Sequence, residues 1–462
     1  MIIRSRAPET EKEVKSIIDE FATELERIDS LNRQYLGDQE ILHKATTGTD
    51  KPDNQLVDNF PGYITTVHTG YFAGRPVKYE SQNDKLLEAV NKILEFNDEQ
   101  EHNFEMSKAA SKCGIAYEMY YFDEDTNFRI VLTDSEQTII VHDDTVAHKI
   151  IAAIRLWTDA EKYINADVYD TKYITHYKSS KSKKTYTITD KKDEHKFDDV
   201  PFTEFPNNRE RQGDYEKVMT LIDEYDNSQS ETANDFDYFT DAYLAIYGAS
   251  STDVEDVTKM KNDRVLLMPE GSDAKWLTKT IQDTASENHK NRLEADIHKF
   301  SFTPDMSDES FAGNTSGEAM KYKLWGLEQM AVQKERCFKK GLQRRFEIIC
   351  SVLKVKGSTS YDYREIDMKF TRNMPKVISD MAKVVLDLTG IVPKKMLYAL
   401  LPFIDDPEEA IKEMEEEQSL DLTRYENDGE STADNTEAAG TTEPVDAGTG
   451  RPGETTDTEP VR

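Results

Sequence analysis

The segment Asn59–Tyr79 reads NFPGYITTVHTGYFAGRPVKY and passes from one kind of secondary structure to another. Its middle suits a helix, which we expect to end at Gly74 and Pro76 because both residue types interrupt helices. Val77–Tyr79 then alternates apolar and polar side chains, which favours the start of a β-strand. Helical stretches and a separate stretch of strands flank this segment, so the chain is predicted to have an α+β fold.

Apolar residues recur at helical spacing on both sides of this segment. We expect helices over about 9–45, 84–98, 100–113, 213–241, 284–303 and 318–354. The last of these is the longest, and its basic residues crowd its second half, where they complement the helix dipole.

Between about residues 115 and 205 the apolar residues recur at every second position, which is typical of β-strands. Residues 116–122 and 128–132 flank a turn at Asp123–Asn127 and predict a hairpin. Further strands are expected over 138–141, 150–157, 168–178 and 185–189. This region is predicted to be a mostly antiparallel β structure.

The remainder of the chain divides by composition. A short α/β insertion is expected over about 242–283, a β segment over 361–371 and a helical region over 376–418. From residue 419 onward the chain loses almost every large apolar residue and fills with Thr, Gly, Asp, Glu and Pro. Residues 419–462 are therefore predicted to be a disordered acidic tail.

The formal net charge of −32 limits the possible partners of the chain. Proteins that hold DNA by neutralising its phosphates need a basic face. The nearest candidate, residues 178–184, is interpreted as a solvated hairpin tip. The chain therefore either has no DNA partner or contacts DNA without gripping it.

Other broad classes are also disfavoured. No apolar run approaches the roughly 20 residues of a membrane span, so we expect no membrane partner. The N-terminus has no signal-peptide pattern, and the three Cys lack metal or redox spacing. These features predict a cytosol-like compartment.

Sequence motifs that carry chemistry are missing. The chain has no G-x-x-x-x-G-K-[ST] phosphate loop, no H-E-x-x-H and no G-x-S-x-G. We therefore predict no catalytic residue, no cofactor and no metal site. Glu294 and His298 lie one helical turn apart and could share a metal ion, but one pair is not a site, and a solvent-facing pair is the expectation. Carboxylates are so abundant that a metal nuclease stays open.

Four segments together resemble the portal proteins of siphophages that infect Gram-positive bacteria. They are residues 59–79, 234–248, 296–329 and 403–410, and their order matches the family along about residues 10–418. No single motif is diagnostic, but the collinear set is specific. The resemblance implies a subunit of a dodecameric ring with wing, stem, clip and crown regions.

Mapped onto this chain, the resemblance divides it into eight parts. They are N-terminal helices and wing (1–212), first stem helix (213–241), clip (242–283), second stem helix (284–303), tunnel loop (304–317), long wing helix and β segment (318–375), crown (376–418) and tail (419–462).

The same resemblance implies a function. The ring would form the channel at the capsid vertex through which double-stranded DNA is packaged and ejected. It would be a virion component assembled in the host cytoplasm. Its expected partners are the large terminase subunit, a head-completion adaptor, and the major capsid and scaffolding proteins, with ATP hydrolysis left to the terminase.

The resemblance also places candidate contact residues. The tunnel loop would present Asp305, Met306, Asp308, Glu309, Phe311 and Gly313 to the channel, and the stem would present Glu287, Lys290 and Glu294. Clip contacts are expected at Tyr247, Val265, Trp276 and Leu277, which are alternatively buried between subunits. An acidic loop favours loose contact with DNA over tight binding.

Two alternatives stay open on the sequence. A metal-dependent DNA-processing enzyme predicts cleavage of plasmid DNA. A different minor capsid or adaptor ring predicts a smaller ring without a long central stem.

Overall fold

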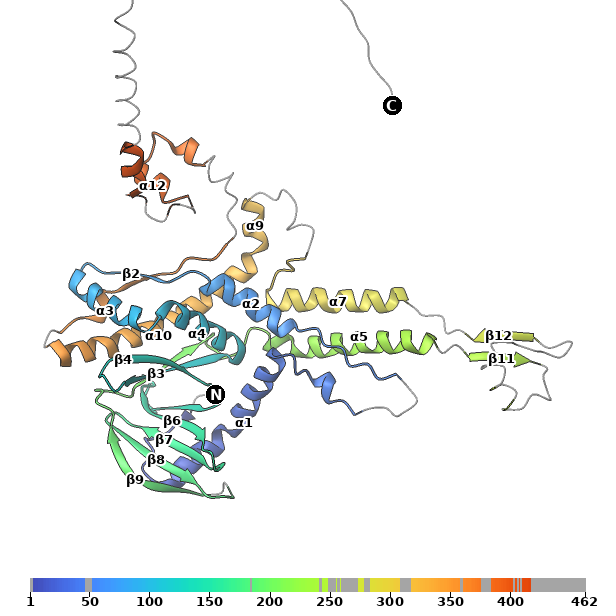
Figure 1. The fold of residues 1–462 in the computed structure, drawn as a ribbon, viewed down its shortest axis with the longest axis horizontal. Helices are drawn as coiled ribbons and strands as arrows, with labels where there is room; N and C mark the ends of the chain where they lie inside the picture. Colours follow the sequence, from blue (N-terminus) through green and yellow to red (C-terminus); the bar gives the residue numbers. More distant parts are fainter. Residues whose placement is uncertain are drawn as a thin grey trace, which may run out of the picture. The chain divides into compact units, whose positions relative to one another are not determined.

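The computed structural model describes residues 3–45, 52–182, 185–240, 243–247, 255, 258, 273–277, 283–307, 317–357, 360–374, 384–401, 404, 407 and 409–416. It divides into two units, Met1–Pro375 and Lys376–Arg462. The first unit holds helices and β-sheets in separate stretches of chain, as an α+β fold does (Figure 1).

One sheet of the first unit packs against the N-terminal helix α1 (Glu11–Tyr35). The helix begins at Thr10, whose side chain and that of Glu13 cap each other's backbone N–H groups. It buries Val14, Ile17 and Phe21 against apolar side chains of the sheet. The helix is shorter than the predicted 9–45 because the chain turns into a 3₁₀ segment, Glu40–His43.

This sheet has the strand order β1-β5-β6-β7-β8-β9. Its strands are β1 (Ile3–Arg4), β5 (Thr138–His142), β6 (Ile150–Thr158), β7 (Ile164–Tyr169), β8 (Tyr173–Ser179) and β9 (Tyr186–Glu194). The β1–β5 pair is parallel and the others are antiparallel. The single strand predicted over 168–178 is wrong: the Asp170 carboxylate accepts hydrogen bonds from the backbone N–H groups of Lys172 and Tyr173 and turns the chain into a hairpin.

A second sheet has the order β10 (Phe202–Pro206), β3 (Ile115–Phe122), β4 (Phe128–Thr133). The long helix α10 (Trp325–Gly357) packs against it through Phe338, Leu342 and Phe346. A Cβ on Gly341 would lie 2.5 Å from the Phe205 ring, so glycine is what allows this close approach. The helix predicted over 318–354 is divided into α9 (Gly317–Lys323) and α10, with glycine at 326 just after the break.

Three further helices complete this core. They are α2 (Phe60–Ala73), α3 (Asp84–Phe96) and α4 (Glu99–Cys113), close to the predicted ranges. The helix α4 ends at Gly114, which has a φ of +82° and lies against the Arg211 carbonyl. After α2, β2 (Lys78–Glu80) pairs with β13 (Asp367–Lys369), so the predicted strand after Gly74 is confirmed but short.

Two antiparallel helices, α5 (Met219–Thr240) and α7 (Asp283–Ser301), lie side by side (Figure 1). Their contact is apolar near one end, where Ile222, Leu293 and Ile297 are buried. It becomes polar farther along: Lys290 Nζ donates to Gln229 Oε1 at 3.2 Å, and the Thr232 and Ser286 hydroxyls are 3.1 Å apart. Between these helices in the sequence, β11 (Tyr243–Tyr247) pairs with β12 (Asp273–Leu277).

The extended segment 52–58 runs along α5 and is held by a ladder of side-chain hydrogen bonds. The acceptors lie four residues apart and therefore on one face of the helix. The backbone N–H groups of Asn54, Leu56 and Asp58 donate to Asn234 Oδ1 (2.6 Å), Ser230 Oγ (2.9 Å) and Asp226 Oδ1 (2.9 Å), respectively.

In the second unit, the structure describes helical residues 384–388, α12 (Lys394–Tyr398) and helical residues 409–416. The predicted tail 419–462 lies outside the described residues. Within the described parts of the chain, no helix is both long enough and apolar enough to cross a membrane.

Candidate functional site

The end of α7 and the residues directly after it are fixed on α2. Phe302, just after α7, has a φ of +57°, and this left-handed turn reverses the chain direction. The Tyr63 hydroxyl of α2 then donates to the Pro304 carbonyl at 2.8 Å and accepts from the Met306 N–H at 3.0 Å. Residues 304–306 are therefore held in place where the predicted tunnel loop begins.

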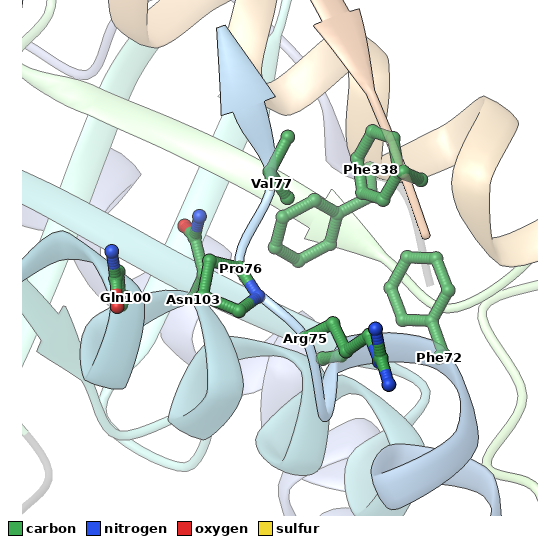
Figure 2. A pocket seen from close by; sticks show the side chains of 9 residues that line it. Phe72, Arg75, Pro76, Val77, Gln100, Asn103 and Phe338 are labelled. Carbon is green, nitrogen blue, oxygen red and sulfur yellow. The ribbon is translucent and has the colours of Figure 1, made fainter. Parts of the chain in front are cut away.

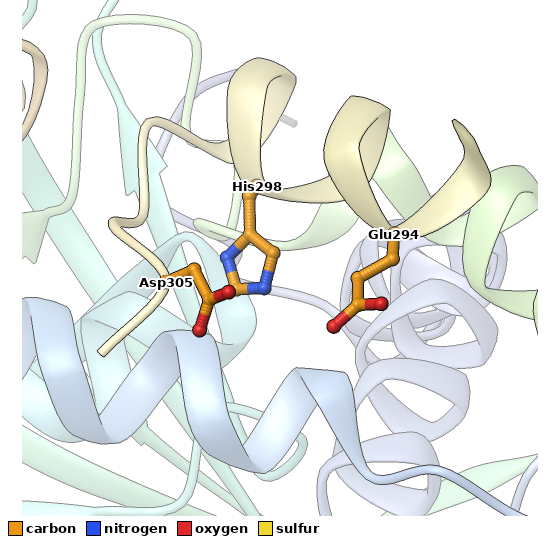
Figure 3. Close-up of side chains that lie close together, drawn as sticks. All are labelled: Glu294, His298 and Asp305. Carbon is orange, nitrogen blue, oxygen red and sulfur yellow. The ribbon is translucent and has the colours of Figure 1, made fainter. Parts of the chain in front are cut away.

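The two hydrogen bonds of Tyr63 to residues 304–306 are called the clamp below. Three side chains that can bind a metal ion converge beside it. Glu294 and His298 project from the last turns of α7, and Asp305 lies opposite them on the next segment of the chain (Figure 3). One ligand atom from each lies within 4.8 Å of the others. They line one side of a pocket of about 280 Å³, with Asp58, Phe60 and Tyr63 on the α2 side.

His68 of α2 contacts the turn that follows α7, at Ser301 and Thr303. Its Nε2 lies 3.0 Å from Thr303 Oγ1 and 3.2 Å from the Ser301 carbonyl. Burial, with the nearby charge of Lys334, lowers the pKa of His68 to about 4, so the imidazole is neutral and Nε2–H is the donor. This contact is structural, because His68 is 1% exposed.

A buried ion pair lies next to His68. Asp214 lies just before the 3₁₀ segment Glu216–Val218 that leads into α5. It forms an ion pair with Lys334 of α10, and both side chains are nearly inaccessible to solvent. Burial alone would raise the pKa of the Asp214 carboxyl, but the charge of Lys334 and the hydrogen bond from Ser111 hold it below its usual value. This pair ties the chain just before α5 to α10.

The core contains a second set of buried charges around Arg345 of α10. Its guanidinium hydrogen-bonds Glu118 of β3 and Glu99 of α4, and the three side chains are at most 5% exposed. Burial alone would raise the pKa of Glu118, but the charge of Arg345 and the hydrogen bond from His102 lower it to about 2. Every charge has a partner, which marks a structural network.

The cavity beside this network is too small for a substrate. It has a volume of about 10 Å³, room for roughly one water molecule. Figure 2 shows the rings of Phe72 and Phe338 on one side and Asn103 and Gln100 on another.

The structure places the predicted stem residues on α7. Lys290 is only 7% exposed and pairs with Glu287 while facing α5. Glu287 is exposed, and Glu294 is half-buried at the pocket. Their role in lining a channel stays a prediction.

The predicted loop and clip residues are only partly described. Asp305 and Met306 lie in the clamped segment, whereas Asp308, Glu309, Phe311, Gly313 and Val265 lie outside the described residues. Tyr247, Trp276 and Leu277 belong to the β11–β12 pair, in which Trp276 is opposite Leu244 and Leu277 is opposite Tyr243. Nothing in the sequence signalled that Tyr63 would bind Pro304, because 241 positions separate them.

The paired helices α5 and α7, the segment 304–306 held by Tyr63 and the buried ion pairs of Asp214 and Arg345 are features of a structural subunit. The family model for "Phage portal protein, SPP1 Gp6-like" matches residues 14–421, and the chain belongs to this family. Its members are structural, so the chain is not an enzyme.

Curated relatives carry the same description. The portal protein of Bacillus phage SPP1 is 27% identical over 419 residues, covering 84% of this chain and 82% of the relative. The portal protein of Clostridium phage phiCD119 is 26% identical over 455 residues, covering 90% of this chain and 98% of the relative. The resemblance found in the sequence is thus confirmed.

A solved structure is also similar in part. It is described as the neck of a native GTA particle computed with C12 symmetry, and it covers 74% of this chain and 89% of its own. The TM-score is 0.43 and the sequence identity 11%.

Proposed function

We propose that this chain assembles into a dodecameric portal ring at the capsid vertex, through which double-stranded DNA is packaged and ejected. The observation that carries the proposal is the family assignment over residues 14–421. The ring would be assembled in the host cytoplasm and retained in the virion.

Exposed apolar side chains support an assembly of several copies. Phe300 at the end of α7 is 52% exposed, Tyr322 of α9 is 81% exposed and Trp325 at the start of α10 is 63% exposed. Large apolar side chains with this much exposure are candidates for a contact with another protein surface. A neighbouring copy of the same chain is the occupant that a ring supplies.

The charge of α5 fits a channel wall that does not hold DNA. The helix carries six Asp or Glu residues, of which Asp226 is buried, and no Lys or Arg. Binding to DNA phosphates requires cations on the protein, so this surface repels the duplex instead of retaining it. The two helices α5 and α7 are the proposed stem, with Glu287, Lys290 and Glu294 as candidate wall residues.

We propose that residues 304–317 are the tunnel loop and the closest contact to DNA. The two hydrogen bonds of Tyr63 fix its first residues, which supports a loop with a rigid root. The proposed contact residues are Asp305, Met306, Asp308, Glu309, Phe311 and Gly313.

The remaining regions keep the same division. The N-terminal helices and wing would be residues 1–212, continued by the long wing helix and β segment at 318–375. The clip would be residues 242–283 and the crown residues 376–418. We propose that the clip, through Tyr247, Val265, Trp276 and Leu277, binds the large terminase subunit and later a head-completion adaptor. The major capsid and scaffolding proteins would contact the outer surface of the ring.

Two assays together test this function. In a phage that lacks this protein, heads should contain no packaged DNA, and supplying the chain should restore packaging. The purified chain should neither cleave plasmid DNA with Mg²⁺ or Mn²⁺ nor bind it with a steep salt dependence. Packaged heads without the chain, or metal-dependent cleavage by it, would contradict the proposal.

A further inference from the structure

We propose that Glu294, His298 and Asp305 bind a divalent transition-metal ion, of the class that includes Zn²⁺ and Co²⁺. Two of these residues come from one helical face, and the third comes from the clamped segment that faces it (Figure 3). All three are half-buried and border the pocket of about 280 Å³, which gives an ion and its water access.

The strongest support is the orientation of His298. Its Nδ1 lies 3.1 Å from the Thr303 carbonyl, which can only accept, so Nδ1 carries the proton. Nε2 is then the nitrogen with the free lone pair. Metal-binding histidines are held in this way, with the second ring nitrogen donating to a carbonyl or carboxylate.

Aromatic neighbours fix the plane of the same imidazole. The Phe60 ring meets it edge to face at a centroid distance of 6.0 Å, and the Tyr63 ring does so at 5.7 Å. Because the ring contacts two aromatic side chains of α2 and hydrogen-bonds the Thr303 carbonyl, little side-chain entropy remains to be lost when Nε2 binds an ion.

Asp305 is positioned by separate contacts. One carboxylate oxygen, Oδ1, accepts from the N–H of Ser307 at 2.8 Å and from its hydroxyl at 2.7 Å. The backbone on both sides is held by the Tyr63 hydroxyl. The other oxygen, Oδ2, remains available to a ligand, and within the described part of the chain the Glu294 carboxylate forms no hydrogen bond or ion pair.

The donor set selects the kind of ion. One imidazole nitrogen with two carboxylates suits Zn²⁺, Co²⁺ or Mn²⁺, whereas Ca²⁺ and Mg²⁺ prefer sites made of oxygen alone. A tetrahedral ion with bonds of about 2.0–2.1 Å separates its ligands by roughly 3.4 Å. The three ligand atoms lie within 4.8 Å of one another, so they must approach by about an ångström to reach this spacing, which rotation of the Glu294 side chain allows. A water from the pocket would fill the fourth position.

A bound ion would join the last turns of α7 to the segment 304–307 by a second connection, in addition to the Tyr63 hydrogen bonds. The metal site stands on its geometry alone. Its consequence, a tunnel loop with a metal-stiffened root, rests on the function proposed above.

The test uses the full-length chain without an affinity tag. Co²⁺ is titrated while the visible absorption of a low-coordinate Co²⁺ complex is monitored, and Zn²⁺ is then added as a competitor. We expect one ion per subunit, displaced by Zn²⁺ and not by a tenfold excess of Ca²⁺. His298→Asn keeps a donor for Thr303 and removes Nε2, so it should weaken binding by at least about tenfold.

Two further variants complete the design. Glu294→Gln removes a ligand from a half-buried position without disturbing a hydrogen bond within the described residues, so it tests the site if His298→Asn is unstable. His289→Asn is the matched control, because His289 lies on the same helix, is exposed and, among the described residues, has one acidic neighbour, Glu224, at 3.6 Å. It should bind the ion as the wild-type chain does.

The outcome is decisive in either direction. Absence of a Co²⁺ band, equal binding by wild type and by both ligand variants, or full displacement by Ca²⁺ would overturn the metal site. Ring formation, checked on the same samples by electron microscopy, is independent of this result, so failure of the site and failure of the proposed function are distinguishable.

Discussion

Asp226 is a fully buried carboxyl group on α5, and replacing it with Asn should stabilise the protein at high pH. Its Oδ1 accepts from the Asp58 N–H at 2.9 Å, and Oδ2 has no hydrogen-bond partner among the described residues. Burial, with the nearby charges of Asp58 and Asp223, raises the pKa of Asp226 from 3.8 to about 7.

The direction of the pH effect is set by this raised pKa. Between pH 4 and pH 7 the folded state holds a proton on Asp226 that the unfolded state has released. The free energy of unfolding therefore falls as the pH rises through this range, and the effect is complete above pH 7. The difference between 3.8 and about 7 corresponds to roughly 4 kcal/mol, which is an upper bound if water reaches Oδ2.

Asp226→Asn keeps the acceptor for Asp58 and cannot ionise. We expect its thermal midpoint to exceed that of the wild type at pH 8 and to differ much less at pH 5, at one fixed protein concentration. Hydrogen exchange in α5 and in residues 52–58 should slow in parallel at pH 8. The control, Glu224→Gln, replaces an exposed carboxylate on the same helix and should show no such pH dependence. An equal difference at both pH values would refute the reasoning.

Three further substitutions test the packing. Arg345→Met leaves Glu118 and Glu99 buried without their cationic partner and should lower the free energy of unfolding by about 3–5 kcal/mol, seen as a lower thermal midpoint. A decrease below about 1 kcal/mol would contradict the stabilising role of this network. Tyr63→Phe removes two hydrogen bonds of about 1 kcal/mol each. Hydrogen exchange in residues 302–307 should therefore become faster. Unchanged exchange would show that these hydrogen bonds do not hold the segment. Gly341→Ala drives a methyl group into Phe205 and should destabilise by about 1–3 kcal/mol, whereas Gly70→Ala, which meets no atom within 4 Å, should not.

Local patterns were enough to predict most elements of the fold. The helices 84–98 and 100–113 and the hairpin around Asp123–Asn127 were placed within a few residues of their observed bounds, because apolar periodicity and turn residues act locally. The strand over 168–178 failed because one side chain, that of Asp170, supplies the turn. An Asp within an alternating run gives no strong warning of this.

The site was less predictable than the fold. Glu294 and His298 were recognised as a pair from their spacing, but Asp305 joins them only because Phe302 reverses the chain and Tyr63 clamps residues 304–306. Contacts across 241 positions depend on tertiary packing and leave no local pattern. Likewise, the burial of Lys290 against α5 could not be predicted, because it depends on the position of Gln229 on another helix. Its place on a channel wall stays a prediction.

The most direct measurement of the central claim is a cryo-electron microscopy reconstruction of the purified full-length chain. The account predicts a closed ring with a central channel lined by α5 and α7, with the segment after Asp305 reaching farthest inward and with Tyr322 and Trp325 covered by the neighbouring subunit. Monomers, or a ring whose channel is lined by other elements, would contradict it.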